Sequence, residues 1–520
     1  MSLQNVAGIL EPSWPPWPQY TAFDYNYSVT NRGKMVNGKW TSQRNKSHTP
    51  PLFLDRLDQY LGPECPPTNS TNTSQKACDD DVRLFPDDIK RIEEKVMRFN
   101  IPHKIVLLVK EDIPYISLQF SRWHLRDTLN HTTGTRKMCP NCHIRNARKF
   151  IPPNPREPAH VRYFPSCSDY RNAKAFQDEG GGRDFPGQVL VGDCGESQHG
   201  SGRVFWDKGL EKMDYDSTFV DRGGPFVRTY AHLHLAPGHT YQQSGLPAFH
   251  TVSDFAEHLL TTPVPSWPRH VNNTHLLQRL GNTSILKDLH EKYDAAFLHG
   301  DCGHLRGMLL REMVEGSNES RVATIARYGR CFHNIETDDV MGGGYRRDNI
   351  TKPKKDEEES EESKEVRMAD MIHKDQEAHR DASKVALMSH HKFGFALENT
   401  LSPYYFTEKR WQVLIADSVP IVWNNDNSIQ YLPDPDAALL VTVPSQKNAE
   451  EVAQVAQEVA KELHYYAQPE HEQEYLEKFF AWKHRGLRPD FVRKLFLSTD
   501  FLFCRICEYM AHHHFYDEET

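Results

Sequence analysis

The sequence lacks the features expected of a membrane-spanning or a nucleic-acid-binding protein. None of its apolar runs approaches the ~18 residues that a membrane helix needs. The N-terminus, Met-Ser-Leu followed by a Pro/Trp-rich stretch, does not have the pattern of a signal peptide. With 62 Lys and Arg against 71 Asp and Glu, the net charge of −9 offers no general attraction for nucleic acid. The 520 residues exceed one ordinary hydrophobic core, so we expect two or more domains.

Two features that are present indicate a lumenal or secreted protein. Glycosylation sequons, Asn-X-Ser/Thr without a central Pro, are several times more frequent than the roughly three that chance predicts. They lie at Asn26, Asn45, Asn69, Asn72, Asn130, Asn272, Asn282, Asn318 and Asn349. The 10 cysteines are an even number, which is compatible with disulfides in an oxidising compartment. We therefore expect a lumenal domain whose targeting or anchor segment is absent from this sequence; a cytosolic chain rich in Asn, Ser and Thr is the alternative.

Short apolar runs predict a parallel α/β fold. Runs typical of buried strands occur at residues 104–109, 115–120 and 188–191, and a second series begins at 295–298. That second series is expected to alternate strands with helices, the strands at 392–397, 419–423 and 438–443 and the helices at 321–330, 407–416 and 448–466. Such alternation indicates a parallel sheet, whose ligands bind at the carboxyl ends of its strands.

The segment from Lys392 to Trp423 carries the main chemical signal. An apolar strand ends in Glu398 and Asn399, and after a short turn Thr-Glu408-Lys409 opens a helix. A helix N-terminus offers free backbone N–H groups and the positive end of its dipole, which suit a pyrophosphate. Lys409 could reach the same phosphates, and Glu408 could accept hydrogen bonds from ribose hydroxyls. Taken alone, this pattern is weak evidence and more typical of exposed residues at the start of a helix.

The order and spacing of this segment closely resemble the signature of the α1,3/4-fucosyltransferases. That family carries Phe-Glu-Asn-Ser, Tyr-(Ile/Val)-Thr-Glu-Lys and Val-Pro-(Val/Ile), and this chain has Leu-Glu-Asn-Thr, Tyr-Phe-Thr-Glu-Lys and Val-Pro-Ile in the same order. The resemblance implies that Asn399, Tyr405, Glu408 and Lys409 contact the donor GDP-fucose. It also implies that Glu398, beside them, faces the fucose.

Two further residues are assigned from the same resemblance. Residues 295–303 look like the family's strand ending in Ser-Asn-Cys, and Arg321 matches its donor-site arginine, whose guanidinium would stabilise charge on the leaving GDP. An insertion at 304–319 separates this strand from Arg321. Other arginines therefore remain alternatives for the donor-site role, namely Arg327, Arg330, Arg346 and Arg347. An inverting transfer also needs a base for the acceptor hydroxyl. Glu196 follows the strand at 188–191 as the family's catalytic Glu does, with Asp193 as its nearest alternative.

The cysteine pattern and the lack of an acidic metal motif predict catalysis without a cofactor. The pairs Cys139/Cys142 and Cys504/Cys507 have the spacing of zinc ligands, but an oxidising compartment favours disulfides, and the second pair resembles the family's disulfide-forming terminal cysteines. No DxD motif of the kind that other transferases use with manganese stands out. We therefore expect no metal site and no cofactor, with Arg321, Lys409 and the helix N-terminus replacing the cation.

The resemblance implies an α/β protein with two Rossmann-like domains that face across a cleft (GT-B type). We expect an irregular arm at 1–80, an acceptor domain at 81–285, a GDP-fucose domain at 286–466 with a charged insertion at 352–380, and C-terminal helices at 467–520 that pack back on the first domain. The implied activity is an inverting α1,3-fucosyltransferase that acts on a GlcNAc-containing glycan of glycoproteins in the Golgi lumen. Another GT-B transferase, such as an exostosin-like one, and a non-catalytic glycan-binding protein are the alternatives.

Overall fold

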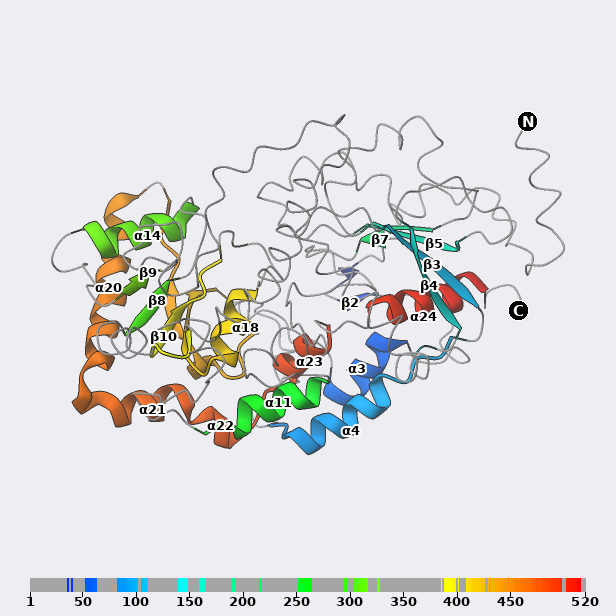
Figure 1. The fold of residues 1–520 in the computed structure, drawn as a ribbon, viewed down its shortest axis with the longest axis horizontal. Coiled ribbons are helices and arrows are strands. Elements are labelled where there is room, and N and C mark those ends of the chain that lie inside the picture. Colours follow the sequence, from blue (N-terminus) through cyan, green and yellow to red (C-terminus); the bar gives the residue numbers. More distant parts are fainter. Residues whose placement is uncertain are drawn as a thin grey trace, which may run out of the picture.

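The structure, a computed structural model, contains two parallel sheets joined by helices (Figure 1). It describes residues 35–36, 39–40, 52–62, 82–101, 104–110, 139, 141–147, 159–164, 189–192, 215–216, 251–263, 294–297, 304–316, 325–327, 385, 388–398, 401, 408–425, 429, 431–446, 448–497 and 502–515. A separate antiparallel pair, β1 (Met35–Val36) and β2 (Lys39–Trp40), lies near the N-terminus.

The first sheet has the strand order β4-β3-β5-β6-β7, and all its pairs are parallel. Its strands are β3 (Ile105–Lys110), β4 (Cys142–Ala147), β5 (Val161–Phe164), β6 (Val189–Gly192) and β7 (Tyr215–Asp216). Helices α3 (Phe53–Leu61) and α4 (Pro86–Val96) precede it, and α11 (Val252–Thr261) follows. Numbered along the chain, the strands run 2-1-3-4-5, which is a doubly wound order with its switch point between β3 and β5.

The second sheet repeats this order as β12-β11-β10-β8-β9, again with all pairs parallel. Its elements are β8 (Ala295–Phe297), α14 (His304–Glu315), β9 (Ile325–Arg327), β10 (Phe393–Phe395), α18 (Glu408–Ile415), β11 (Val419–Asn424), the 3₁₀ turn η3 (Pro435–Ala437) and β12 (Leu439–Thr442). The switch point therefore lies between β8 and β10, and ligands of this fold bind at the carboxyl ends of these two strands.

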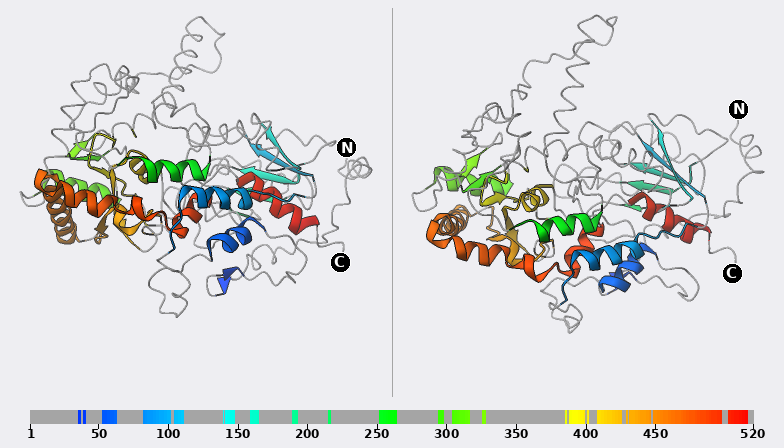
Figure 2. Two further views of the ribbon diagram at one scale, coloured as in Figure 1. Left: turned by 90° about the horizontal axis from the view of Figure 1, so that it is seen from below. Right: turned by 60° about the horizontal axis from the view of Figure 1, so that its bottom comes forward.

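Six C-terminal elements complete the fold. They are α20 (Ala449–Ala467), the 3₁₀ turn η4 (Pro469–His471), α21 (Glu472–Phe480), α22 (Trp482–Arg485), α23 (Pro489–Leu497) and α24 (Leu502–Phe515). Asn448 starts α20 by accepting hydrogen bonds from the backbone of Glu450 and Glu451. The run α21–α23 leads from the second sheet to the first, and α24 ends beside β3 and β4 (Figures 1 and 2).

The two-domain α/β architecture of GT-B type is confirmed, and so are most of the predicted strands and helices. The expected strand at 115–120 lies outside the described residues. The helix expected at 321–330 is wrong, because residues 325–327 form β9 beside β8. The residues 304–319, interpreted as an insertion, contain α14, the regular crossover helix between β8 and β9. The domain boundaries given above stay predictions, although α3 shows that the 1–80 region includes an ordered helix with buried residues.

Alternate residues of β10 pack on opposite sides of the second sheet. Phe393 and Phe395 face a core formed with α14, α20 and α21. Gly394 faces α18, where Val413 lies so close that an added Cβ would come within 2.7 Å of its Cγ2. A side chain at this position would therefore push α18 away from the sheet. The absence of a side chain at residue 394 allows α18 to lie directly on β10.

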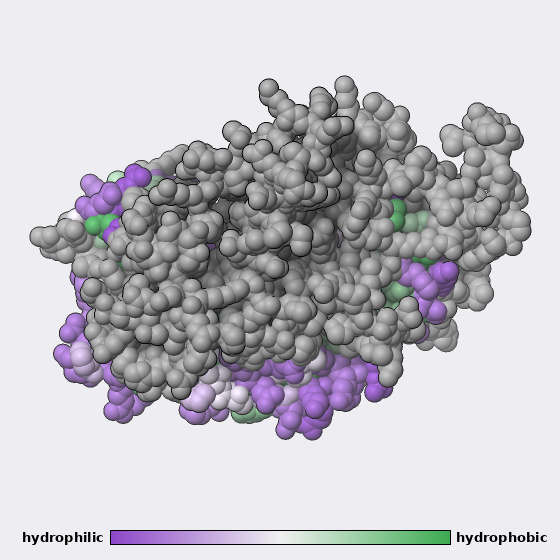
Figure 3. Space-filling view, viewed as in Figure 1, coloured by the Kyte–Doolittle hydropathy of each residue, from purple (hydrophilic) through white to green (hydrophobic). Residues whose placement is uncertain are grey.

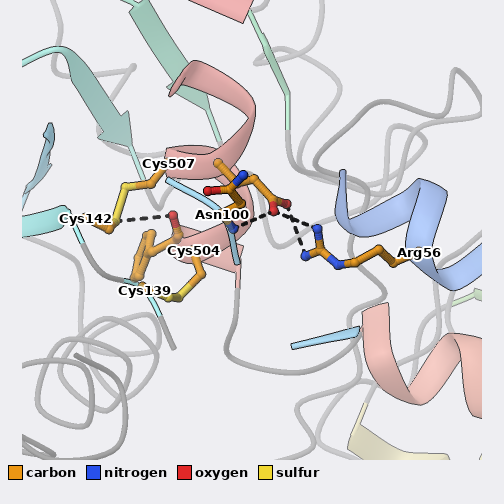
Figure 4. Close-up of a disulfide and its surroundings, with 8 residues drawn as sticks. Arg56, Asn100, Cys139, Cys142, Cys504 and Cys507 are labelled. Atoms are coloured by element: carbon orange, nitrogen blue, oxygen red, sulfur yellow. Dashed lines mark hydrogen bonds and ion pairs between the residues drawn. A yellow bond between two sulfur atoms is a disulfide. The ribbon is translucent and has the colours of Figure 1, made fainter. Parts of the chain in front are cut away.

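Two disulfides and a buried ion pair join α24 to the first domain (Figure 4). Cys139 bonds to Cys504 and Cys142 bonds to Cys507, so the expectation of disulfides in place of zinc is confirmed for these four residues. Glu508 accepts hydrogen bonds from Arg56 of α3 and from the backbone of Phe53 and Asn100. Burial raises the pKa of the Glu508 carboxyl above its ordinary value. The C-terminal helix is thus covalently and electrostatically part of the first domain.

Within the described residues, no helix is both long and apolar enough to cross a bilayer. Their surface is mainly hydrophilic along the edge where Figure 1 has α21, α22 and α4 (Figure 3). Few large apolar side chains are exposed anywhere in the described part of the chain, namely Val82, Phe85, Met308, Leu401 and Tyr465. Scattered exposed apolar residues of this kind are normal for a protein surface and do not mark a docking face.

Candidate functional site

The carboxyl ends of β8 and β10 bring together residues from three elements. Arg306, in the first turn of α14, is buried, and its Nη1 donates to the carbonyl oxygen of Leu397 at 3.3 Å. The indole Nε1 of Trp423, on β11, donates to the carbonyl oxygen of Glu398 at 3.0 Å. The backbone of Leu397 and Glu398 is therefore held by side chains from α14 on one side and β11 on the other. This is the position where a doubly wound sheet binds its ligand.

Helix α18 places its N-terminus beside the same two residues. The helix begins at Glu408, and the Nζ of Lys409 lies 3.7 Å from Oε2 of Glu398. The Glu398 side chain is buried and that of Lys409 is 19% exposed. Because Lys409 keeps contact with solvent while Glu398 does not, the ammonium is the part of this pair that can meet an incoming ligand.

Arg410, the next residue of α18, has a charged guanidinium that is buried inside the protein. It is 1% exposed, and burial lowers the pKa of its guanidinium to about 10, while Glu398 and Tyr431 act in the opposite direction. The group stays charged at neutral pH, since that value is well above 7. A buried charge of this kind requires a counter-charge nearby. Glu398 supplies it, so one carboxylate serves both Lys409 and Arg410.

The predicted site residues divide into those that the structure places and those that it does not. Glu398 and Lys409 lie together, and the backbone of Glu408 opens α18 as expected. Four residues fall outside the described ranges, namely Glu196, Arg321, Asn399 and Tyr405, as does the side chain of Glu408. β6 ends at Gly192, and Asn399 follows the described end of β10 directly. The assignments of these residues stay predictions.

Arg306 is a candidate that the sequence analysis missed. It was placed in an insertion, whereas α14 is the first crossover helix of the second sheet and begins just after β8. The signal that could have identified Arg306 is its position, a basic residue in the first turn after the strand at the switch point.

No group of three or more His, Cys, Asp or Glu in the described part of the chain is arranged to hold a metal ion. The expectation that no metal or cofactor is required stays a prediction. What the described residues provide at the switch point is positive charge, from Arg306 and Lys409.

Comparison with known proteins bears on the segment that contains this site. Residues 357–519 match the C-terminal model of glycosyltransferase family 10 (fucosyltransferase). The resemblance to the fucosyltransferases is confirmed. The matching segment includes β10, α18 and all later elements, and hence Glu398, Lys409 and Arg410. It does not include β8, α14 or any part of the first sheet.

Relatives resemble the chain over a limited length. A putative fucosyltransferase-like protein of Arabidopsis thaliana is 31% identical over 128 residues, which cover 25% of this chain and 23% of the relative. An alpha-(1,4)-fucosyltransferase of the same plant is 28% identical over 121 residues, which cover 23% of this chain and 27% of the relative. The chain thus matches about a quarter of the length of these relatives.

Solved structures of an alpha1,3-fucosyltransferase align with a larger share of the chain but at lower similarity. The structure with GDP covers 77% of this chain and 91% of its own, with 11% identity and a TM-score of 0.35. The structure with GDP-fucose covers 73% and 82%, with 12% identity and a TM-score of 0.34. A TM-score this low does not establish a shared fold by itself, so the architecture rests on the chain's own two parallel sheets.

Proposed function

We propose that the protein is an inverting fucosyltransferase that uses GDP-fucose and transfers fucose in α1,3 linkage to a GlcNAc-containing glycan of glycoproteins. The observation that carries the proposal is that Arg306 contacts Leu397 and Lys409 contacts Glu398, two adjacent residues that follow β10. Lys409 and β10 lie in the segment that matches the fucosyltransferase model. A nucleoside diphosphate is the leaving group of such a transfer, and it gains negative charge as the sugar departs.

Two cations at the switch point suit this leaving group. Charge-assisted hydrogen bonds from Arg and Lys to phosphate oxygens stabilise the charge that builds up in the transition state. Arg306 is added to Arg321 as a proposed phosphate ligand, because its guanidinium contacts the end of β10. Asn399, Tyr405 and Glu408 would complete the site around the ribose and the base. The proposed chemistry uses no metal ion.

The first domain would supply the acceptor site and the base. Glu196 lies a few residues beyond the end of β6, and loops that follow parallel strands carry ligand-facing side chains. Its carboxylate would accept the proton of the acceptor hydroxyl as the hydroxyl oxygen attacks the anomeric carbon of fucose and the bond to GDP breaks. The two disulfides support an oxidising compartment such as the Golgi lumen, together with the sequons.

Donor binding and transfer can be tested with one pair of variants on α14. Arg306→Gln removes the proposed phosphate ligand, and Arg311→Gln removes an exposed arginine of the same helix and serves as the matched control. We expect the first change to lower kcat/KM for GDP-fucose about 10- to 100-fold, the cost of losing a hydrogen bond to a charged group. The control is expected to stay within twofold of the wild type. Calorimetry with GDP, UDP and ADP gives the donor class, and a glycan panel gives the acceptor.

Each outcome has a definite consequence. Binding of UDP but not GDP would replace the proposal with another GT-B transferase, such as an exostosin-like one. Binding of GDP without transfer to any glycan of the panel would favour a binding protein. Unchanged transfer by Glu196→Gln would remove that residue as the base. Equal losses in the two arginine variants would show that Arg306 acts through the stability of α14.

A further inference from the structure

The carboxyl end of β10 carries a buried carboxylate. The family resemblance implies that Glu398 faces the fucose, which stays a prediction. In the structure only 5% of its side chain is exposed, the Nζ of Lys409 lies 3.7 Å from its Oε2, and its charge acts electrostatically on Arg410. Its carbonyl oxygen is also held, by the indole of Trp423. Glu398 thus has contacts with protein groups on both α18 and β11.

Arg410 explains why a carboxylate is buried at this point. A guanidinium that is 1% exposed must be neutralised by a neighbouring anion, because an uncompensated buried charge is strongly destabilising. Electrostatic attraction by Glu398 favours the charged form of Arg410. The pair adds no net charge to the site.

Lys409 is the second partner and differs from Arg410 in exposure. Consecutive helix residues point about 100° apart, so a carboxylate that faces both lies at the N-terminal end of α18, between their side chains. A lysine side chain is long and flexible, and most of its positions would take the ammonium away from the site. The contact with Glu398 at 3.7 Å restricts Lys409 to positions at the end of β10. A group that is already in place loses less freedom when a ligand binds.

We propose that Glu398 is a positioning residue that holds the ammonium of Lys409 ready for the donor diphosphate and is itself neutralised by Arg410. The inference rests on the proposed function, since it takes the ligand to be a nucleoside diphosphate. Among the described residues, Arg306 and Lys409 are cationic side chains that contact the end of β10. Their positive charge suits a diphosphate.

A double-mutant cycle with two ligands tests the inference. Glu398→Gln, Lys409→Met and the double variant are titrated by calorimetry with GDP and with guanosine, which has no phosphate. We expect Glu398→Gln to raise the Kd for GDP about tenfold when Lys409 is present and less than twofold when Met replaces it. The Kd for guanosine is expected to stay within twofold in all variants, because Lys409 does not act on the nucleoside.

Glu398→Asp covers the case in which Glu398→Gln leaves Arg410 uncompensated and prevents folding. Aspartate keeps the negative charge near Arg410 but is shorter by one methylene, so its carboxylate withdraws from Lys409. This variant is expected to fold, to bind guanosine normally and to bind GDP more weakly, again only when Lys409 is present. If it also fails to fold, Glu398 is a structural partner of Arg410 alone and the inference is wrong.

Three binding results would overturn the inference while leaving the proposed function intact. One is an equal loss of GDP affinity with and without Lys409, and another is an equal loss for guanosine. The third is tighter GDP binding by Glu398→Gln, which would mean that Glu398 competes with the diphosphate for Lys409. A wild-type protein that binds neither GDP nor GDP-fucose would overturn the proposed function, and this inference with it.

Discussion

Replacing Gly394 by alanine should loosen the contact between the donor-site helix and its sheet. A Cβ built at this position lies 2.7 and 2.9 Å from the two Cγ atoms of Val413, and 3.1 Å from Sδ of Met388. Val413 is fully buried and β-branched, so it has few alternative rotamers. Alanine gains about 0.4–1 kcal/mol from the lower entropy of the unfolded chain, but overpacking costs about 1–3 kcal/mol. The overpacking term is the larger, and we expect a net loss of about 1–2 kcal/mol.

The assay is denaturant unfolding followed by tryptophan fluorescence, in which Trp411 and Trp423 report on α18 and β11. Val413→Ala is the matched variant. Alone it should cost about 1–2 kcal/mol of buried methyl groups, but combined with Gly394→Ala it makes room for the new side chain. The double variant should therefore lose at least about 1 kcal/mol less than the sum of the single losses. Additive losses, or a Gly394→Ala variant as stable as the wild type, would refute the close approach of α18 to β10.

Three further predictions concern other contacts. Burial raises the pKa of Glu93, which accepts hydrogen bonds at the N-terminus of α11, above its ordinary 4.5, so the folded state binds this proton more tightly. The stability due to this proton is complete below pH 4.5 and is lost as the pH rises through the folded pKa. Urea titrations at a series of pH values should therefore show a smaller loss of unfolding free energy with rising pH in Glu93→Gln than in the wild type. An unchanged pH dependence in the variant would contradict the shift. Both disulfides close nearly the same 365-residue loop, so the Cys142→Ser/Cys507→Ser variant should lose little stability in thermal unfolding, whereas the variant without either bridge should lose about 2–5 kcal/mol. If removing the first bridge cost as much stability as removing the second, this reasoning would be wrong. Lys483→Met removes the ion pair of Lys483 with the buried Asp417 and should lower the free energy of unfolding by about 3–5 kcal/mol in chemical unfolding. Adding Asp417→Asn should restore most of this stability, and no restoration would show that the pair itself is unimportant.

The strands and helices that the sequence predicted are those whose pattern is local. The helix at 448–466 has a capping Asn448 and apolar residues at helical spacing, and α20 follows that prediction closely. β9 was missed because Ile325–Arg327 is too short to show a period of two, and its strand character comes from pairing with β8. α14 was interpreted as part of an insertion because residues 304–319 have no counterpart in the spacing of the family pattern. Its role depends on β8 and β9, which the sequence shows only faintly.

The donor site could be predicted only where its chemistry is carried by neighbours in the sequence. Lys409 was found because it follows a recognisable strand and turn, whereas Arg306 reaches the same point from 91 positions earlier in the chain. No local pattern distinguishes it from Arg311, the exposed arginine of the same helix. Its position follows from the order of the strands, since β8 and β10 are neighbours only after the sheet has formed. Residues that long-range topology brings to a site are therefore the part that sequence patterns conceal.

The burial of α18 is a feature that the sequence did not reveal. A helix that starts with Thr-Glu-Lys-Arg looks amphipathic and solvent-exposed, but Trp411 packs edge-on against Phe255 of α11 and also contacts Phe491 of α23. At the other end of the helix, His258 Nε2 lies 3.0 Å from the carbonyl oxygen of Ile415. α18 is therefore enclosed between the second sheet and helices packed on the first domain, and this position puts Arg410 in the interior. Because Arg410 is buried, a nearby anion is needed to compensate its charge, and Glu398 at the end of β10 acts on it electrostatically. This is the basis on which we propose a positioning role for Glu398.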